Sequence, residues 1–171
     1  IGFGHQHAHA VMPAPALEAI PPDPPGIAVR PAEERDIELL ARLDILLHDH
    51  QLASPVFSGH PAPTLEEAVA EYQGEWGDPR FVILAAEVGG SVVGSVVGCE
   101  VEESGGNSGL IRPPGAAFLA FAAVLPAAQG RGVGRALANG ILRWAATNGC
   151  ETVAIDWRVT GSASSVFRRY I

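Results

Sequence analysis

A cluster of glycines is the part of this sequence best suited to chemistry. It reads Gln129-Gly130-Arg131-Gly132-Val133-Gly134 and stands between an apolar segment ending at Val124-Leu125 and a segment with helical spacing. Closely spaced glycines let backbone N–H groups approach an anion without interference from Cβ atoms. The start of a helix adds unsatisfied donors and about half a positive charge. The cluster therefore predicts a site for a phosphate-bearing ligand.

Two other phosphate-binding glycine motifs fit this cluster poorly. A P-loop requires lysine followed by Ser or Thr, but the sequence contains no lysine, and Gly134 is followed by Arg135-Ala136. A Rossmann fingerprint lies in the first strand-to-helix turn, whereas three segments with strand character precede the one that leads into this cluster. A structural glycine turn and another kind of anion site remain as alternatives.

The cluster does match the pattern Gln/Arg-x-x-Gly-x-Gly/Ala, through Gln129, Gly132 and Gly134, with Pro126 three residues before it. In these residues, and in the order of the elements around them, the sequence resembles the GCN5-related N-acetyltransferase (GNAT) superfamily over about residues 27–171. The resemblance implies an acetyltransferase that binds the pyrophosphate of acetyl-CoA, its co-substrate, in this loop. It also implies an α/β fold with a central mixed, mostly antiparallel sheet, flanked by helices and splayed between its fourth and fifth strands.

The resemblance assigns roles to individual residues. The implied cofactor-binding residues are Val124, Leu125, Gln129, Gly130, Arg131, Gly132, Val133, Gly134, Arg135 and Ser164. The N–H of Leu125 would polarise the thioester carbonyl, an effect worth about 3 kcal/mol for one donor. The usual Asn and Tyr positions of the family hold Gly161 and Arg168, so Tyr170, the candidate acid, is two residues out of register.

The sequence names no clear general base for deprotonating an amine. Candidates are Glu100, Glu102, His48, Asp49, His50 and His60. Attack by the small neutral fraction of an amine, with water relaying the proton, is equally consistent with these residues.

Segments of strand and helix character alternate around the cluster. Strands are predicted at 27–29, 81–88, 91–102, 116–125 and 152–155, with a tight hairpin at Gly89-Gly90. Helices are predicted at 33–47, from the capping-box residue Thr64 towards Pro79, from Val133 to Gly149, and from Ser162 onward. Because 116–125 is almost wholly apolar, we expect a central strand covered on both faces.

Composition limits the class of protein. A chain of 171 residues with 47% hydrophobic content predicts one globular domain. The net charge of −8 and the pI near 5.1 argue against binding to nucleic acid or to a membrane surface. Cys99 and Cys150 fit neither a disulfide framework nor a metal site, which favours the cytoplasm and no bound metal.

The two ends of the sequence differ from the middle. Residues 1–26, rich in Gly, His and Pro, are predicted to be a flexible leader without function. Residues 27–171 are predicted to be the acetyltransferase-like domain, and because the sequence stops at Ile171, the resemblance implies that the last two strands of the family are missing from it. We expect truncation to be the reason, and the alternative is that a partner chain or fragment supplies these strands. An exposed sheet edge would remain, which leaves a homodimer open.

The sequence therefore predicts a cytoplasmic N-acetyltransferase that moves an acetyl group from acetyl-CoA to a primary amine of a small molecule or peptide. Direct attack in a ternary complex is the expected route. The alternative is a non-catalytic acyl-CoA-binding regulatory module, motivated by Gly161 and Arg168. A nucleotide-binding α/β domain is disfavoured by the missing lysine.

Overall fold

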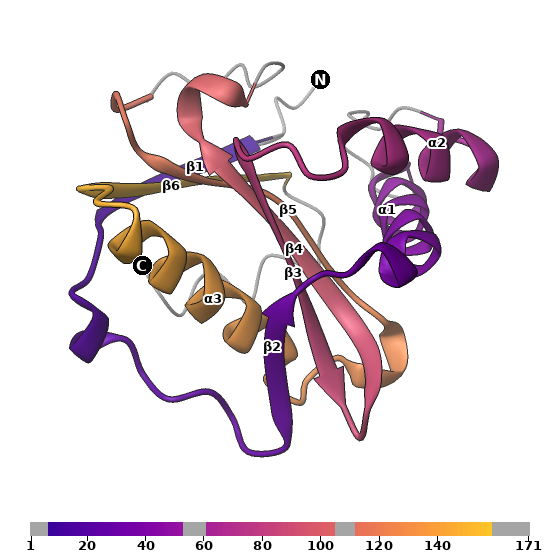
Figure 1. The fold of residues 1–171 in the computed structure, drawn as a ribbon, viewed down its shortest axis with the longest axis horizontal. Helices are drawn as coiled ribbons and strands as arrows, with labels where there is room; N and C mark the ends of the chain where they lie inside the picture. Colours follow the sequence, from indigo (N-terminus) through magenta and orange to yellow (C-terminus); the bar gives the residue numbers. More distant parts are fainter. Residues whose placement is uncertain (1–6, 53–60, 105–111, 159–171) are drawn as a thin grey trace, which may run out of the picture.

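The computed structural model describes residues 7–52, 61–104 and 112–158, which form one mixed sheet flanked by helices (Figure 1). The sheet has six strands in the order β1-β6-β5-β4-β3-β2, and β5 and β6 run parallel while the other neighbours are antiparallel. The strands are β1 (His7–Pro13), β2 (Ile27–Pro31), β3 (Phe81–Val88), β4 (Ser91–Glu100), β5 (Ala117–Val124) and β6 (Thr152–Arg158). The α-helices are α1 (Ile37–Leu52), α2 (Leu65–Glu75) and α3 (Val133–Thr147). The predicted fold class is confirmed.

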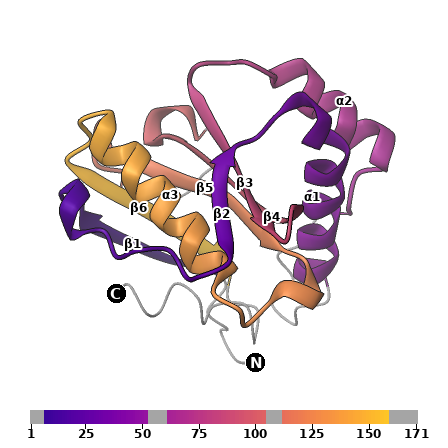
Figure 2. The same ribbon diagram turned by 60° about the horizontal axis from the view of Figure 1, so that its bottom comes forward.

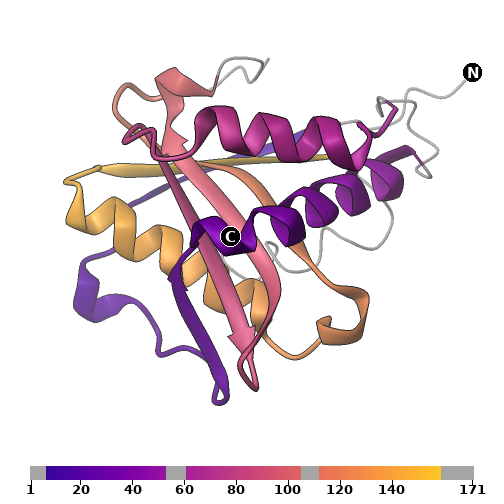
Figure 3. The ribbon, with the colours of Figure 1, turned by 45° about the vertical axis from the view of Figure 1, so that its right-hand side comes forward.

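The helices cover the sheet from two sides. Figure 2 and Figure 3 show α3 against one face and the pair α1 and α2 against the other. The stripe of α3 formed by Val133, Leu137 and Ile141 is buried against Leu84 and Val96 of the sheet. Burial of this apolar stripe fixes the helix that begins at the glycine cluster.

Several local predictions are confirmed. The strand at Phe81–Val88 ends in a hairpin whose Gly89 and Gly90 have φ values of 60° and 79°. Thr64 caps α2 by accepting a hydrogen bond from the Glu67 amide, and Glu67 accepts in return from the amide of Thr64. These features rest on chemistry between near neighbours in sequence, which a sequence pattern can reveal.

The strand at Ala117–Val124 is central, but its burial differs from the prediction. Its first residues are buried, whereas Ala120 is exposed and Phe121 and Ala122 are half-buried. The reason lies in the parallel pairing with β6, which runs from Ala117 to Leu119. Within the described residues, no pair between β5 and β6 follows Leu119 and Ile155.

The N-terminal segment departs most from the sequence analysis. Residues 1–26 were expected to be flexible, yet residues 7–13 pair antiparallel with β6, from His7 opposite Arg158 to Pro13 opposite Thr152. Backbone hydrogen bonds supply this pairing, so it does not require a strongly apolar strand. The β6 edge that was expected to be exposed is therefore covered by β1, and the residues after β1 run alongside α3 (Figure 2).

The helix predicted from Ser162 lies outside the described residues.

Candidate functional site

The glycine cluster forms a tight loop between β5 and α3. A short 3-10 turn at Pro126–Ala128 leads into it, and Gly130 and Gly132 adopt left-handed φ values of 74° and 92°. The Gln129 side chain folds back and donates to the carbonyl of Val124 at 3.2 Å, while its amide donates to Pro126 at 3.3 Å. The loop is thus held against the end of β5.

The amides that follow Gln129 point to an anion site. Ala136 donates to the carbonyl of Gly132 at 3.1 Å, which is the first hydrogen bond of the helical ladder. Among the described residues, no backbone carbonyl accepts a hydrogen bond from the amides of residues 130–134. Unsatisfied amides at the start of a long helix attract anions through both hydrogen bonding and the helix dipole.

Side chains around the loop divide into two groups. Gln129, Arg131 and Arg135 are exposed, so the loop carries two arginines on its solvent side. The side chain of Val133 is 1% exposed and packs in the core. A ligand would therefore contact only the backbone amide of this residue. Arg131 forms no ion pair with any described residue.

The predicted oxyanion donor is already engaged. The amide of Leu125 donates to the carbonyl of Val93 on β4 at 2.8 Å, so the sheet satisfies it. Neighbouring residues of an antiparallel strand direct their amides to opposite sides. Since Val124 pairs with Gly94, and Ala122 with Val96, the amides of Val124 and Ala122 point away from β4, towards the β6 side. The role assigned to Leu125 is therefore corrected, and Val124 is the better-oriented donor.

The acid and base candidates are only partly described. Tyr170, Ser164 and His60 lie outside the described residues. Glu102 accepts a hydrogen bond from the amide of Gly115 at 2.8 Å, which lowers its pKa and makes it a weaker base. Glu100 is exposed at the end of β4.

The described histidine candidates lie near the end of α1, where the structure adds a carboxylate that sequence analysis missed. Burial raises the pKa of Asp44, and Glu71 raises it further, while His48 opposes the shift. The Nδ1 atom of His48 lies 3.5 Å from Oδ1 of Asp44. A carboxyl group whose pKa is raised is a candidate for proton transfer. In the sequence, Asp44 directly follows Leu43 on the apolar side of α1, near the buried Leu40. This placement of a carboxylate next to buried residues is the signal that could have identified Asp44.

Neither cysteine is prepared for nucleophilic catalysis. Cys99 is fully buried, and burial raises its pKa to about 11. Burial also raises the pKa of Cys150. Because the thiolate is the nucleophilic form, these raised pKa values disfavour both thiols as nucleophiles at neutral pH.

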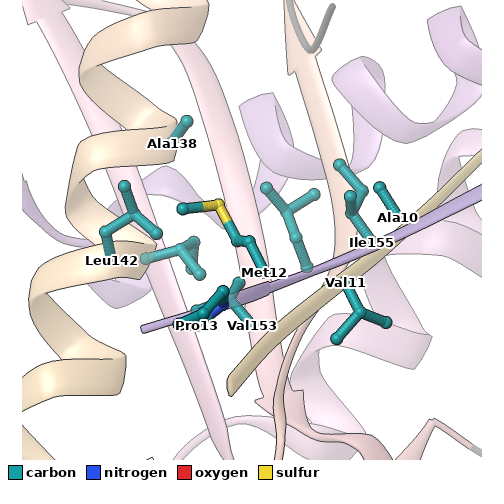
Figure 4. Close-up of a pocket in the computed structure, with 10 residues that line it drawn as sticks. Ala10, Val11, Met12, Pro13, Ala138, Leu142, Val153 and Ile155 are labelled. Atoms are coloured by element: carbon teal, nitrogen blue, oxygen red, sulfur yellow. The ribbon is translucent and has the colours of Figure 1, made fainter. Parts of the chain in front are cut away.

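An apolar cavity of about 250 Å³ lies away from the loop, between α3 and the sheet (Figure 4). Its lining comes from β1, β5, β6 and α3, and consists of Ala10, Val11, Met12, Pro13, Leu119, Ala138, Ile141, Leu142, Val153 and Ile155. No residue of the glycine cluster lines it.

The described residues carry neither a metal-binding cluster nor a membrane-spanning helix. No group of three or more His, Cys, Asp or Glu side chains in that part of the chain is arranged to hold a metal ion. No helix there is long and apolar enough to cross a membrane.

Comparison with known proteins adds to this geometry. The model of the Acetyltransferase (GNAT) family matches residues 45–165. Similar solved structures include aminoglycoside 6'-N-acetyltransferase AAC(6')-Ih from Acinetobacter baumannii, with 17% identity, a TM-score of 0.60, and 85% of this chain and 88% of that chain covered. A predicted acetyltransferase with acetyl-CoA from Clostridium acetobutylicum has 14% identity and a TM-score of 0.60, covering 84% and 88%. A GCN5-related N-acetyltransferase from Kribbella flavida has 27% identity and a TM-score of 0.54, covering 72% and 67%.

The comparison with curated proteins finds no match. The family model nevertheless spans well over half of the chain, and it contains the glycine cluster together with β5 and α3. This chain therefore belongs to the acetyltransferase (GNAT) family, whose members are acetyl-CoA-dependent enzymes.

Proposed function

We propose that this chain transfers an acetyl group from acetyl-CoA to a primary amine by direct attack in a ternary complex. The observation that carries the proposal is the set of amides at residues 130–134, which no described carbonyl engages and which open the buried helix α3. Several free amides at a helix N-terminus form a site for an anion, and the diphosphate of a coenzyme is an anion of this kind.

The residues around the loop fit coenzyme A. The amides of residues 130–134 would hold its pyrophosphate, with Arg131 and Arg135 adding charge from the exposed side. The amides of Val124 and Ala122 would hold the arm that carries the thioester, since they face the side where pairing between β5 and β6 ends at Leu119. Acetyl-CoA supplies an activated acyl group, and a donor at Val124 takes the role first assigned to Leu125.

Direct attack is favoured over an acyl-enzyme route because burial raises the pKa of both cysteine thiols. The amine nitrogen forms a bond to the acyl carbon, the carbon–sulfur bond breaks, and the thiolate takes up the proton that the amine loses. An acyl-enzyme would need a thiolate, which the burial of Cys99 disfavours. Tyr170 stays a prediction for the acid, and Asp44 joins the candidates for the base.

The experiment is release of free thiol from acetyl-CoA in the presence of a panel of primary amines, with matched tertiary amines as controls. We expect thiol release with at least one primary amine and none with its tertiary counterpart. Binding of coenzyme A is measured in parallel by calorimetry. Failure of coenzyme A to bind at all would refute the assignment of the loop.

A second function, acyl-CoA binding without turnover, is favoured by one observation. The sequence has Gly161 and Arg168 where the family usually has an Asn and a Tyr, so the usual acid is missing at its expected position. This hypothesis predicts normal coenzyme A affinity with no thiol release for any amine in the panel. Thiol release that saturates with a primary amine would eliminate it.

Further features of the function remain proposals. The acceptor is a small-molecule or peptide amine, and the net charge of −8 favours a cationic one. The absence of a disulfide pattern among two cysteines favours the cytoplasm. A homodimer is a further proposal, which size-exclusion chromatography with light scattering would test.

A further inference from the structure

Residues 14–26, here called the strap, connect β1 to β2 by crossing α3. Ala14 and Ile20 pack on an apolar cluster that contains Leu142 and Ala145 of that helix. The amide of Ala14 also donates to the carbonyl of Glu151 at 2.9 Å, which ties the start of the strap to the sheet. The strap is therefore anchored at the sheet edge and along the second half of α3.

Polar side chains fix the strap to the middle of α3. Asn139 is 0% exposed and donates from Nδ2 to the carbonyl of Pro21 at 3.0 Å and to Oδ1 of Asp23 at 2.9 Å. Arg143, one turn further along the same helix face, lies 2.6 Å from the same carboxylate oxygen. Asp23 thus bridges two α3 side chains, and its charge makes both hydrogen bonds stronger than neutral ones.

The next residue of the strap touches the glycine cluster. Pro24 is buried, and a Cβ atom built on Gly132 would lie 2.8 Å from its Cγ atom and 3.2 Å from its Cβ atom. The carbonyl of Pro24 then accepts from the amide of Ile27 at 3.4 Å, where β2 begins. The proline ring is held from both sides, by Asp23 before it and by the start of β2 after it.

We propose that Asp23 and Pro24 are positioning residues for the coenzyme A loop. This inference rests on the proposed function of that loop. A glycine has the largest conformational freedom of any residue, so amides on either side of Gly132 converge on an anion only when something restricts its φ angle. The ring of Pro24, held by the contacts of Asp23 to Asn139 and Arg143, supplies that restriction. Fixing the amides beforehand lowers the cost of ordering them when the ligand binds.

The test uses the full chain and measures coenzyme A binding by calorimetry, with hydrogen exchange of residues 130–134 in the free protein. We expect Asp23→Ala and Pro24→Ala to raise the dissociation constant about fivefold to tenfold and to speed exchange in the loop. Asp23→Asn keeps an acceptor for Asn139 and loses the ion pair with Arg143, so its effect should be intermediate. Glu38→Ala, which breaks the exposed pair with Arg42 on α1, is the matched control and should change neither quantity.

The outcomes separate this inference from the proposed function. If the unaltered chain binds coenzyme A and all the strap variants bind it equally well, the strap does not position the loop. If the unaltered chain binds no coenzyme A, the proposed function fails and this inference fails with it. A purely structural role would lower the unfolding midpoint without changing loop exchange below that midpoint. Should Asp23→Ala fail to fold, Asp23→Asn and Pro24→Ala still decide between these results.

Discussion

Replacing Gly132 by Ala should cost far more stability than the same change two residues earlier. Both Gly130 and Gly132 have left-handed φ values, 74° and 92°, and a residue with a Cβ atom pays about 1–2 kcal/mol in that region. The surroundings differ, because a Cβ atom at Gly132 would lie 2.8 Å from Pro24, whereas at Gly130 nothing lies within 4 Å. Overpacking of this kind costs about 1–3 kcal/mol. We therefore expect losses of about 1–2 kcal/mol for Gly130→Ala and about 2–5 kcal/mol for Gly132→Ala.

The assay is urea unfolding of the two variants followed by fluorescence, with the free energy of unfolding extrapolated to water. A third variant, Gly132→Ala combined with Pro24→Ala, removes the Cγ atom that the new methyl group would meet. Its cost relative to Pro24→Ala alone should fall towards that of Gly130→Ala, giving a coupling energy of at least about 0.5 kcal/mol. Equal losses for Gly130→Ala and Gly132→Ala, or no coupling with Pro24, would refute the steric reasoning.

Three further predictions concern the fold and the chemistry. Thr64→Ala should lower the free energy of unfolding by about 1 kcal/mol in chemical denaturation, because it removes the acceptor for the Glu67 amide. Hydrogen bonds from Arg30 lower the pKa of Asp36, so this carboxylate contributes stability above its unfolded pKa of about 3.9 and loses it as the pH falls through the folded pKa. Unfolding midpoints measured from pH 7 to pH 3 should therefore fall less steeply for Asp36→Asn than for the unaltered chain. Cys99→Ala should leave kcat for acetyl transfer unchanged, and iodoacetamide should label Cys99 at pH 7.5 only after unfolding, because burial raises its pKa to about 11.

Features set by neighbouring residues could be predicted from the sequence. The cap at Thr64, the hairpin at Gly89-Gly90 and the glycine loop each depend on groups a few residues apart, so residue type and spacing suffice to find them. The helix α3 could be predicted for a similar reason, because its apolar stripe repeats with the helical period.

Features set by distant residues could not be predicted. The pairing of residues 7–13 with β6 joins segments separated by most of the chain, and nothing within the HAHAVMP sequence specifies that partner. The bonds from Asn139 to Pro21 and Asp23 likewise span more than a hundred residues. A sequence pattern reports which face of an element is apolar, but it does not say which segment will cover that face.

The error at Leu125 has a different origin. The sequence places this residue at the end of the correct strand, but not the side of the strand to which its amide points. The sequence locates the end of β5 correctly to within one residue, but a shift of one residue turns an amide from one neighbouring strand to the other. The register is set by β4, where Gly94 lies opposite Val124, and a Cβ atom at Gly94 would be 2.8 Å from the carbonyl oxygen of Ala123. Glycine at that position therefore allows β4 to lie close to β5 just before the loop, which keeps Leu125 bonded to Val93 and turns Val124 towards the open side. The orientation of the amides nearest the coenzyme loop is thus decided on β4, where Gly94 lies 35 residues before Gln129, the first residue of the motif that revealed the site.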